Sequence, residues 1–463
     1  MTMLHIPASH RLRIYDDRGS ALVVSLIFAA AISIALGSYL SLARTTLKLS
    51  HRSYYLNAAM NLAETGLERG MRGLQMHKKG ALDAWTTPWV WDVSGANPKL
   101  VADNTVMFSG NAMGSLRVIV QDHNTSEPTI LARARVQLHE GSPIEKWVMI
   151  TTAKTSKFDL GLVGDYVTFN GKTAHANSFD SSKGPYDEAT NSGKNVTVAA
   201  LAIKNNSLNV GNAKIDGNLA TATGEGDKGV KLGPNAEISG SITYDFERDY
   251  EVEPEPGVVA FSSGSLSGSH VLGTSGGISG THLGKAALFY KYDTINVKSG
   301  EALSVKENTI VVVTLTKTGG TALSVKGEIH IPSTSTLAIY VEGDVDVSGN
   351  GIANDGRPMQ FQIWGTLEEP YAKPQNISIS GNGDFSGIIY APNADVTLNG
   401  GGKDDIDAKG AVVGKSITIN GSGEFHYDES LADEDFGDAF RLKSWSELNT
   451  AAKRAPYLES LEF

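Results

Sequence analysis

The sequence contains no cysteine and little proline, with 15 prolines in 463 residues. Without cysteine, the chain forms no disulfide and offers no thiolate to a metal ion or to a catalytic step. Its 11 histidines are scattered and include no His-Glu-x-x-His arrangement, so the common helix-borne zinc motif is missing. Basic clusters are absent and the formal net charge is −11, which argues against nucleic acid as a partner.

Glycine, in contrast, is abundant, with 50 residues in the chain. This exceeds the usual share of about 7%. Because proline is scarce, the glycines indicate many tight turns rather than a collagen-like or disordered chain. The length favours about two to four domains, although a repetitive β-fold can hold more of the chain in one body.

One long uncharged apolar run lies near the N-terminus, at residues 20–43. About 20 apolar residues are enough to cross the hydrocarbon core of a bilayer as one helix. Three interpretations fit the run: a permanent anchor, a secretory signal cut after Ala43, and a prepilin leader cut after Gly19. Basic residues are nearly balanced on its two sides, so the positive-inside rule does not settle the orientation.

The helix is predicted to continue beyond this run to about residue 75. Apolar residues recur there at steps of four and three, which places them along one face of an amphipathic helix. A helix over residues 20–75 is about 80 Å long. Its first half suits lipid or partner helices, and its second half suits a globular head. The predicted helix-packing residues are Val24, Leu56, Met60, Ala63, Glu64, Leu67, Met71 and Leu74.

Residues 18–24 have the sequence RGSALVV, and residues 61–68 have the sequence NLAETGLE. With the apolar run between them, they resemble the N-terminal region of PilX-type minor pilins of type IV pili. The resemblance covers about residues 10–75. It implies that a prepilin peptidase cuts after Gly19 and leaves Ser20 as the new N-terminus.

The same resemblance implies other pilins or pseudopilins as partners, and a single-pass location in the inner membrane before assembly at the periplasm or cell surface. Major pilins carry a glutamate five places after the leader glycine, where this sequence has Val24. An acidic side chain within lipid is costly and usually functional. Its absence here favours a minor, tip or priming subunit over a major one.

Residues 76–145 are predicted to form a small β-region. Residues 115–121 and 130–138 alternate apolar and polar side chains with period two, and a turn-rich segment separates them. A cluster of three tryptophans precedes these strands. We expect the cluster to pack the strands against the helix, with a sugar-binding platform as the alternative. The three residues are Trp85, Trp89 and Trp91.

A repeat punctuated by glycine and asparagine runs through residues 146–432. The sequence ISISGNGDF at 377–385 returns as ITINGSGEF at 417–425, and related phrases begin at Val345 and Val396. A repeat of about 20 residues fits one coil of a parallel β-helix, whose coils must stack to bury their apolar sides. The predicted fold class is therefore α+β and mainly β: a long transmembrane-to-amphipathic helix, a small β-region, and a parallel β-helix, or solenoid.

Three further phrases resemble an uncharacterised glycine-rich domain that is joined to pilin-like N-termini in Gram-negative bacteria. This resemblance spans about residues 150–450 and implies a β-helical passenger, without any activity. Residues 245–285 are expected to interrupt the repeat, because they are acidic at first and then rich in serine and glycine. Their expected role is a linker-like excursion from the solenoid or a join between two β-blocks. The phrases lie at residues 177–186, 387–394 and 425–431.

The C-terminal residues 433–463 leave the repeat and carry aromatic residues among acidic ones. Ser444 and Glu447 have the spacing of a capping box, which predicts a short helix. A solenoid needs a cap over its open sheet edge. We therefore predict that this tail, with Phe440 and Trp445, is the cap.

One cluster of acidic residues is a candidate calcium site. Asp404, Asp405 and Asp407 follow three glycines, and Ca²⁺ prefers such oxygen ligands. A solvated acidic loop is the alternative, and no other cofactor is predicted.

Paired carboxylates are the other chemistry that the sequence offers. Asp180, Asp187 and Glu188 are candidates for the acids of a polysaccharide-cleaving β-helix, although acidic residues are also common on solenoid turns. Residues 426–429, with the sequence HYDE, look like a site, but their place at the end of the last repeat favours structural capping.

The leading hypothesis is a non-enzymatic, pilin-like surface protein: a minor subunit of a type IV pilus or pseudopilus. Its β-helical module would serve adhesion to a surface glycan or a host ligand, or structural spacing. The alternatives are an envelope-anchored β-helix enzyme that acts on polysaccharide, and a structural envelope protein that polymerises. The predicted order is a leader at 1–19, the pilin-like helix at 20–75 with its transmembrane half at 20–43, a small β head at 76–145, the β-helix at 146–432 and the cap at 433–463.

Overall fold

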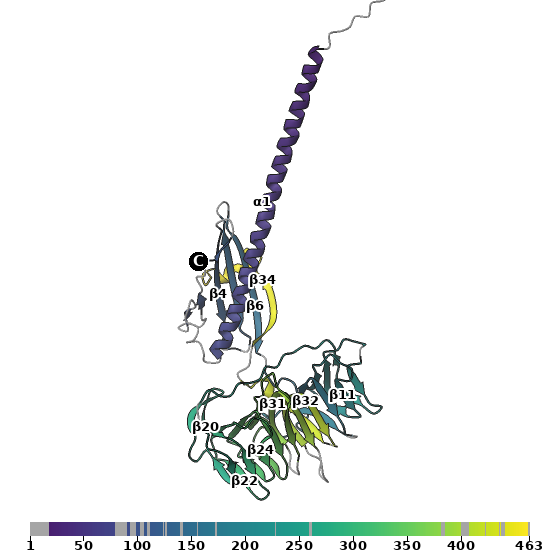
Figure 1. The fold of residues 1–463 in the computed structure, drawn as a ribbon, viewed down its shortest axis with the longest axis vertical. Helices are drawn as coiled ribbons and strands as arrows, with labels where there is room; N and C mark the ends of the chain where they lie inside the picture. The colour runs from purple at the N-terminus through teal and green to yellow at the C-terminus, as the bar shows by residue number, and fades with distance from the viewer. Residues whose placement is uncertain are drawn as a thin grey trace, which may run out of the picture. The chain divides into compact units, whose positions relative to one another are not determined.

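The protein begins with one long apolar helix and continues as a large β-rich region. In the computed structural model, α1 (Arg18–Lys78) runs for 61 residues, and strands dominate the rest of the chain. The chain divides into two compact units. The helix–sheet unit comprises Met1–Ala153 and Phe440–Phe463, and the strand-stack unit comprises Lys154–Ala439 (Figure 1). The structure describes residues 18–461 with gaps at 79–89, 93–98, 102–105, 109–111, 124, 126, 139–141, 155, 172–173, 227, 259–261, 381–384, 400–406, 422, 435 and 437–439.

The helix–sheet unit contains one sheet of seven strands in the order β1-β2-β4-β5-β6-β34, with β3 beside β4. The predicted period-two segments are confirmed as β4 and β5, which form an antiparallel pair from Met113↔Gln137 to Gln121↔Thr129. The strands are β1 (Val90–Asp92), β2 (Lys99–Val101), β3 (Val106–Met107), β4 (Met113–Gln121), β5 (Thr129–Gln137), β6 (Ile144–Lys154) and β34 (Phe440–Glu447).

The second half of α1 packs on one face of this sheet. Leu62, Ala63, Leu67 and Leu74 form a buried cluster with side chains of β4, β5 and β6. Gly70 permits this approach, because a Cβ at that position would lie 2.5 Å from Ile130 Cγ2. The tight glycine positions therefore set the distance between the helix and the sheet.

Side chains on the opposite face form a smaller cluster around Trp147, which is 1% exposed. The C-terminal residues Leu448 and Leu461 complete it. Both follow β34: Leu448 precedes the short helix α2 (Ala451–Arg454), and Leu461 comes after the 3-10 turn η4 (Ala455–Tyr457). The chain end thus covers the second face of the sheet.

The strand-stack unit consists of three columns of parallel strands. The first column contains β16, β13, β10, β7, β32, β31, β29, β26, β23 and β20. The second contains β14, β11, β8, β32, β31, β30, β27, β24, β21 and β17. The third contains β15, β12, β9, β33, β32 and β31 in one run, and β28, β25, β22 and β18 in another.

One further strand, β19, and two short 3-10 turns complete the described elements of this unit. β19 pairs with β20 in antiparallel fashion, unlike the neighbours of β20 in its column. The bounds are β7 (Leu162–Gly164), β8 (Tyr166–Phe169), β9 (His175–Phe179), β10 (Val196–Ala200), β11 (Leu208–Gly211), β12 (Lys214–Ile215), β13 (Gly217–Thr221), β14 (Val230–Leu232), β15 (Glu237–Ile238), β16 (Ile242–Thr243), β17 (Leu266–Ser267), β18 (His270–Leu272), β19 (Ile278–His282), β20 (Lys285–Tyr292), β21 (Ile295–Val297), β22 (Ala302–Val305), β23 (Ile310–Leu315), β24 (Thr321–Val325), β25 (Glu328–Ile331), β26 (Thr336–Val341), β27 (Asp344–Val347), β28 (Gly351–Asn354), η2 (Pro358–Gln360), β29 (Phe361–Gly365), β30 (Gln375–Ile379), β31 (Phe385–Asn399), β32 (Asp407–Asn420), β33 (Glu424–Asp428) and η3 (Glu429–Ala432).

The sequence repeats lie in register in the second column. Val345 pairs with Ile377, Ile377 with Val396, and Val396 with Ile417. All four side chains are at most 1% exposed. Each repeat thus places its first aliphatic residue on the aliphatic residue of the next, and no single repeat buries this side chain by itself.

The chain enters and leaves the strand stack in its middle. The last strands, β32 and β33, pair with the first ones, β7, β8 and β9. Figure 1 shows the olive and yellow strands β31 and β32 between the green strands around β24 and the dark strands around β11. The segment from residue 244 to 265 connects the two halves, because β16 and β17 lie in different halves of the stack.

This connecting segment makes a join between two blocks of strands, which is one of the two roles expected for residues 245–285, although strands replace the expected flexible linker in part of the range. β17, β18 and β19 lie within that range. Before them, Arg248 forms an ion pair with Asp159, and the Glu251 carbonyl accepts a hydrogen bond of 2.7 Å from Tyr390 Oη. Polar contacts at the flank of the stack hold the serine- and acid-rich chain in place, and composition alone does not reveal them.

The predicted cap is also wrong for the chain from Phe440 onwards. Phe440 and Trp445 lie in β34, a strand of the other unit's sheet, and the capping-box pair lies in the same strand. Phe440 packs in the cluster beneath α1. Phe436, which precedes it, covers the flank of the stack against Trp364 and Phe158. The tail was misassigned because its aromatic residues fit either unit equally well by composition.

Candidate functional site

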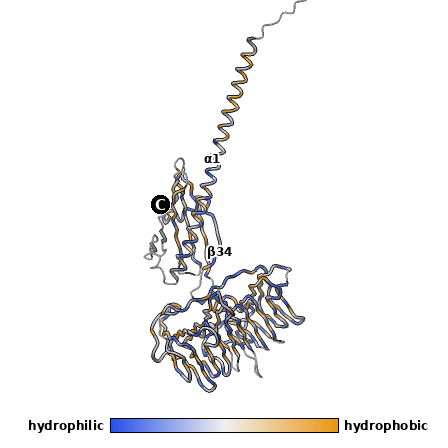
Figure 2. Tube along the Cα trace, viewed as in Figure 1, coloured by the Kyte–Doolittle hydropathy of each residue, from blue (hydrophilic) through white to orange (hydrophobic). Residues whose placement is uncertain are grey.

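The first half of α1 presents an apolar surface without a partner in the described part of the chain. It meets the length and composition of a membrane span, and the most apolar window is 0% buried. Figure 2 shows hydrophobic colour along this half of the helix. Val24 lies on it and is 49% exposed. The predicted processing residues, Gly19 and Ser20, belong to the first helical turn.

Two serine side chains in this apolar half have hydrogen-bond partners within the helix. Ser25 Oγ donates a hydrogen bond to the Leu22 carbonyl at 2.9 Å, and Ser33 Oγ donates one to the Ala29 carbonyl at 2.7 Å. A hydroxyl with an internal partner loses little when lipid replaces water. The apolar half is therefore compatible with a hydrocarbon environment along its length.

The predicted packing residues of the second half divide into two groups. Ala63, Leu67 and Leu74 are buried, and Met60 and Met71 are half-buried at the edge of the same cluster. Leu56 and Glu64 are exposed instead. Their exposure corrects the predicted stripe, because the buried face of the helix combines leucines with several small residues. The small residues are Ala59, Ala63, Gly66, Gly70 and Gly73.

An open groove of about 750 Å³ runs between α1 and β34. Trp445, which is 46% exposed, and Leu442, which is 55% exposed, line it. Glu64, Glu68 and Arg72 lie on its α1 side. Trp445, the exposed aromatic residue predicted to cap the repeat, therefore lies beside α1.

A second candidate site lies in the strand-stack unit, where β33, one of its last strands, pairs with β9, one of its first. Of the predicted calcium ligands, Asp404 and Asp405 lie outside the described residues. Asp407 begins β32, and it pairs in register with Glu424 at the start of β33. His426, two residues further along β33, projects from the same side of that strand. One oxygen of each carboxylate and one imidazole nitrogen lie within 4.8 Å of one another.

His426 is fully buried, with 0% exposure. Its Nδ1 lies 2.6 Å from Asn177 Oδ1, and it must donate the proton, because an amide oxygen only accepts. Its Nε2 has no hydrogen-bond partner among the described residues. This nitrogen lies 3.6 Å from Glu424 Oε2 and 3.9 Å from Asp407 Oδ2. The cluster of Asp407, Glu424 and His426 is named the junction cluster below.

The surroundings of Asp407 favour its ionised form. The His426 imidazole, followed by Lys409, lowers the pKa of Asp407, although partial burial acts in the opposite direction. The neighbouring coil adds His175, whose Nδ1 lies 3.7 Å from the same Glu424 oxygen. Its Nε2 lies 3.0 Å from Asp216 Oδ2. Two imidazoles therefore lie on either side of one carboxylate.

The loop after β9 covers His426. The Tyr186 ring stacks on the imidazole at 3.6 Å between centroids, with 22° between the planes. Its hydroxyl accepts a hydrogen bond of 2.9 Å from Asn177 Nδ2. Asn177 therefore contacts both rings, and its amide orients the imidazole.

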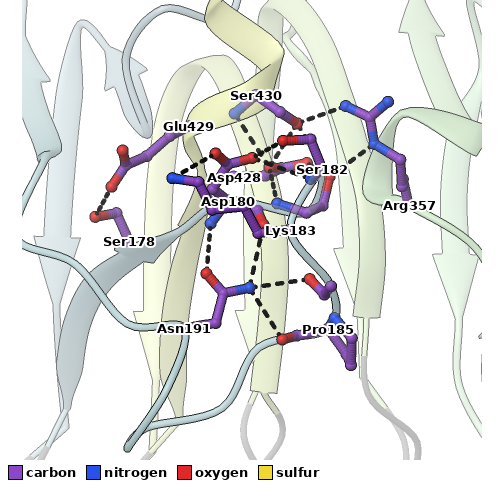
Figure 3. A network of polar contacts seen from close by, with 12 residues as sticks. Ser178, Asp180, Ser182, Lys183, Pro185, Asn191, Arg357, Asp428, Glu429 and Ser430 are labelled. Carbon is purple, nitrogen blue, oxygen red and sulfur yellow. Dashed lines mark hydrogen bonds and ion pairs between the residues drawn. The ribbon is translucent and has the colours of Figure 1, made fainter.

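A polar network holds this loop (Figure 3). Asp428 Oδ1 accepts from Ser181 N at 2.9 Å and from Ser430 Oγ at 2.7 Å. Arg357 donates to Ser181 Oγ and to Ser430 Oγ. Asn191 Nδ2 lies within 3.1 Å of three loop carbonyl oxygens, those of Asp180, Gly184 and Pro185. The side chains at the 426–429 motif thus hold the loop in place.

The candidate catalytic carboxylates serve local turns instead. Asp180 accepts from Ser182 Oγ at 2.6 Å, and Asp187 accepts from Thr190 Oγ1 at 2.7 Å. These hydrogen bonds lower the pKa of both carboxyls. A general acid needs a raised pKa, so neither carboxyl has the protonation behaviour of that role. Glu188 is exposed.

Sequence reasoning missed Glu424 and His175 as members of this site. Both lie at the start of a strand, and they pair directly with each other in register. The available signal was the repeat itself, because it aligns residue 424 with the acidic residue at 384. The repeat does not indicate that β33, near the end of the strand stack, pairs with β9, near its beginning.

Comparisons with known proteins found one family model that matches part of the chain and one similar solved structure. Residues 213–434 match a family model described as Domain of unknown function (DUF7305). No curated protein matches the chain. The crystal structure of competence-associated pilin ComZ from Thermus thermophilus is similar at 12% identity, over 84% of this chain and 97% of that chain, with a TM-score of 0.27. A TM-score of this size does not establish a shared fold.

Proposed function

We propose that this protein is a pilin-like surface protein, a PilX-type minor subunit of a type IV pilus or pseudopilus, without enzymatic activity. One observation carries the proposal. A single unbroken helix has an exposed apolar first half, and a second half that packs on an antiparallel sheet. The first half suits a bilayer and then partner helices, and the second half attaches a folded head to it.

Assembly would begin in the inner membrane, with the helix as a single span. A prepilin peptidase would remove residues 1–19, and the helix from Ser20 would then pack against those of other pilins or pseudopilins. Val24 offers no carboxylate to a neighbouring N-terminus, which supports a minor subunit rather than the main filament subunit. The assembled protein would face the periplasm or the cell surface.

The strand-stack unit would be the displayed module. Its parallel columns with in-register repeats support a β-helix, and its sequence lies between two neighbouring strands of the other unit, β6 and β34. Such an insertion adds a module without changing the order of the sheet that receives it. The module would bind a surface glycan or a host ligand, or act as a spacer.

The mature N-terminus tests the proposal. The full chain is expressed in cells that contain a prepilin peptidase, and intact-mass and N-terminal peptide spectrometry are applied to membrane and sheared-filament fractions. We expect the chain to start at Ser20, and to appear in the sheared fraction at low stoichiometry relative to the major pilin.

Gly19→Val should block cleavage, and Gly37→Val is the matched control, because no heavy atom lies within 4 Å of a Cβ at Gly37. A chain that starts at Arg44 would show a secretory signal and refute the pilin proposal. An intact Met1 in cells with active peptidase would show a plain membrane anchor.

A further inference from the structure

We infer that the junction cluster of Asp407, Glu424 and His426 binds one divalent first-row transition-metal ion, of the Mn²⁺ to Zn²⁺ type. The ion would be held by β32 and β33, at the place where β33 pairs with β9. This site is independent of the pilin-like role proposed above.

The buried imidazole is the first step of the argument. Since Nδ1 donates to Asn177, the neutral ring has its lone pair on Nε2. That atom has no partner among the described residues, and it faces two carboxylate oxygens at 3.6 and 3.9 Å. A buried lone pair that faces two anions is unfavourable unless a cation lies between them.

Two cations are able to fill this position: a proton on Nε2 or a metal ion. A proton would require an N–H···O distance near 2.7 to 2.9 Å, which is shorter than either measured distance. Ligands around a zinc-sized ion at about 2.0 to 2.2 Å lie roughly 3 to 3.5 Å apart. The two separations from Nε2, 3.6 and 3.9 Å, exceed the upper end of this range by a few tenths of an ångström or less, and the two carboxylate oxygens lie within 4.8 Å of each other. The Asp407 and Glu424 side chains, 34% and 41% exposed, have room to move inward.

The donor set selects the class of metal. One imidazole and two carboxylates suit Zn²⁺ or Mn²⁺, whereas Ca²⁺ and Mg²⁺ prefer oxygen ligands throughout. The chain has no cysteine to offer a softer ligand. The set therefore differs from the oxygen-only calcium site that the sequence suggested at the same aspartate.

Contacts with Asn177 and Tyr186 prepare His426 as a ligand. A metal-bound histidine usually donates its other N–H to an oxygen that fixes the ring, and Asn177 Oδ1 has this role here. Tyr186 covers the ring and excludes water from its face. The polar network of Figure 3 fixes the loop that carries Tyr186.

The position of the site explains what the ion would do. All three ligands come from β32 and β33, and both supporting residues, Asn177 and Tyr186, come from β9 and the loop after it. These coils are more than two hundred residues apart in the chain, yet β33 pairs with β9 in register. An ion at this point would stabilise the seam between the two halves of the stack.

Metal titration of the full chain tests the inference. The detergent-solubilised protein is treated with EDTA and titrated with Zn²⁺, Mn²⁺ and Ca²⁺ by calorimetry. We expect one Zn²⁺ or Mn²⁺ per chain and much weaker Ca²⁺ binding. His426→Gln, Glu424→Gln and Asp407→Asn should each weaken binding at least tenfold. His330→Gln is the matched control, because His330 forms an exposed pair with Asp355 away from the cluster, and it should change nothing.

Two further measurements keep the test decisive if His426→Gln disturbs folding. X-ray absorption of the zinc-loaded chain should show nitrogen and oxygen ligands without sulfur. Hydrogen exchange should slow in β9 and β33 when the metal is added, and Glu424→Gln, at a partly exposed position, should remove this effect. No uptake, equal uptake by the well-folded Glu424→Gln and Asp407→Asn variants, or Ca²⁺ binding independent of His426 would overturn the inference.

Discussion

The two units of this protein bury their apolar side chains by different means. In the helix–sheet unit, one amphipathic helix covers an antiparallel sheet, and the tight contact depends on glycines such as Gly66 and Gly70. In the strand-stack unit, repeats place aliphatic residues on one another in long columns. Each buried cluster of described residues lies within one unit.

The two cores differ in how far apart in the sequence their contacting residues lie. The helix face is completed mainly by three strands that are near in sequence, β4, β5 and β6, with Phe440 as the addition from the distant strand β34. A residue within a column contacts the equivalent residues of the strands on both sides of it. Its loss therefore destabilises the neighbouring strands of the stack as well as its own. We therefore expect substitutions in one unit to loosen that unit and to leave the other protected from hydrogen exchange.

The largest effect should follow from Trp364→Ala. The indole is 1% exposed and lies 5.8 Å from the Tyr340 ring and 5.5 Å from the Tyr390 ring. Removing it should cost about 3 to 5 kcal/mol of unfolding free energy. Hydrogen exchange should accelerate in β26, β29 and β31, and not in β4 or β5.

Ile203→Ala is the control in the same unit, because Ile203 is 77% exposed. A surface change of this kind should stay within about 0.5 kcal/mol. Equal acceleration of exchange in both units by Trp364→Ala would show that they unfold together, and would refute the comparison.

A smaller effect should follow from Gly70→Leu, which tests the other unit. A Cβ at this position would lie 2.5 Å from Ile130 Cγ2 and 3.0 Å from Val118 Cγ1. The extra side chain should push the helix off the sheet at a cost of about 1 to 3 kcal/mol. Exchange in β4 and β5 would report it.

Gly37→Leu gives the matched control, because its Cβ would meet no heavy atom within 4 Å. We expect it to leave exchange in the sheet unchanged. A similar loss of protection from both variants would mean that helix propensity, rather than contact with the sheet, controls this unit.

The smallest effect concerns the segment that connects the two halves of the stack. Asp293 accepts hydrogen bonds from Ser262 Oγ at 2.6 Å and from Thr316 Oγ1 at 2.9 Å. Both bonds favour the carboxylate and lower the pKa of Asp293 in the folded protein below the ordinary value of 3.8. The stabilisation is therefore present above this pH, and it is lost as the pH falls through the folded pKa.

Thermal melting of the wild type and Asp293→Asn between pH 2 and 6 measures this contribution. The wild type should melt slightly higher at pH 6, and the difference should vanish at the acidic end. A difference that persists at the lowest pH would show that ionisation of this carboxyl does not hold the segment.

Much of the architecture follows from patterns along the chain. The apolar run and the stripe after it predicted a helix over 20–75, and α1 spans Arg18–Lys78. Alternation predicted the hairpin of β4 and β5. The repeats at 377–385 and 417–425 predicted parallel pairing, and their first residues lie in one column. Each of these features depends on periodicity, which is local.

The errors share a different cause. The fate of Phe440 and Trp445 depends on which distant surface they meet, and composition does not distinguish a strand of one sheet from a cap on another. The connecting segment is similar, since Tyr390 and Asp159 hold it from far along the chain. The motif at 426–429 could be recognised in the sequence. The role of Glu424 beside His426 depends on the pairing of β33 with β9, which carries Asn177, and that pairing is seen only in the structure.

The sequence by itself determined the long apolar helix, the strand hairpin and the repeat, because hydrophobic periodicity of 3.6, of two and of one coil is written in neighbouring residues. Only the tertiary structure decided where the chain closes on itself. The pairing of β33 with β9 and the return of β34 to the first sheet each join residues that are hundreds of positions apart. The stabilisation from such contacts depends on the folding of all the strands between them, so it cannot be predicted from a local sequence pattern.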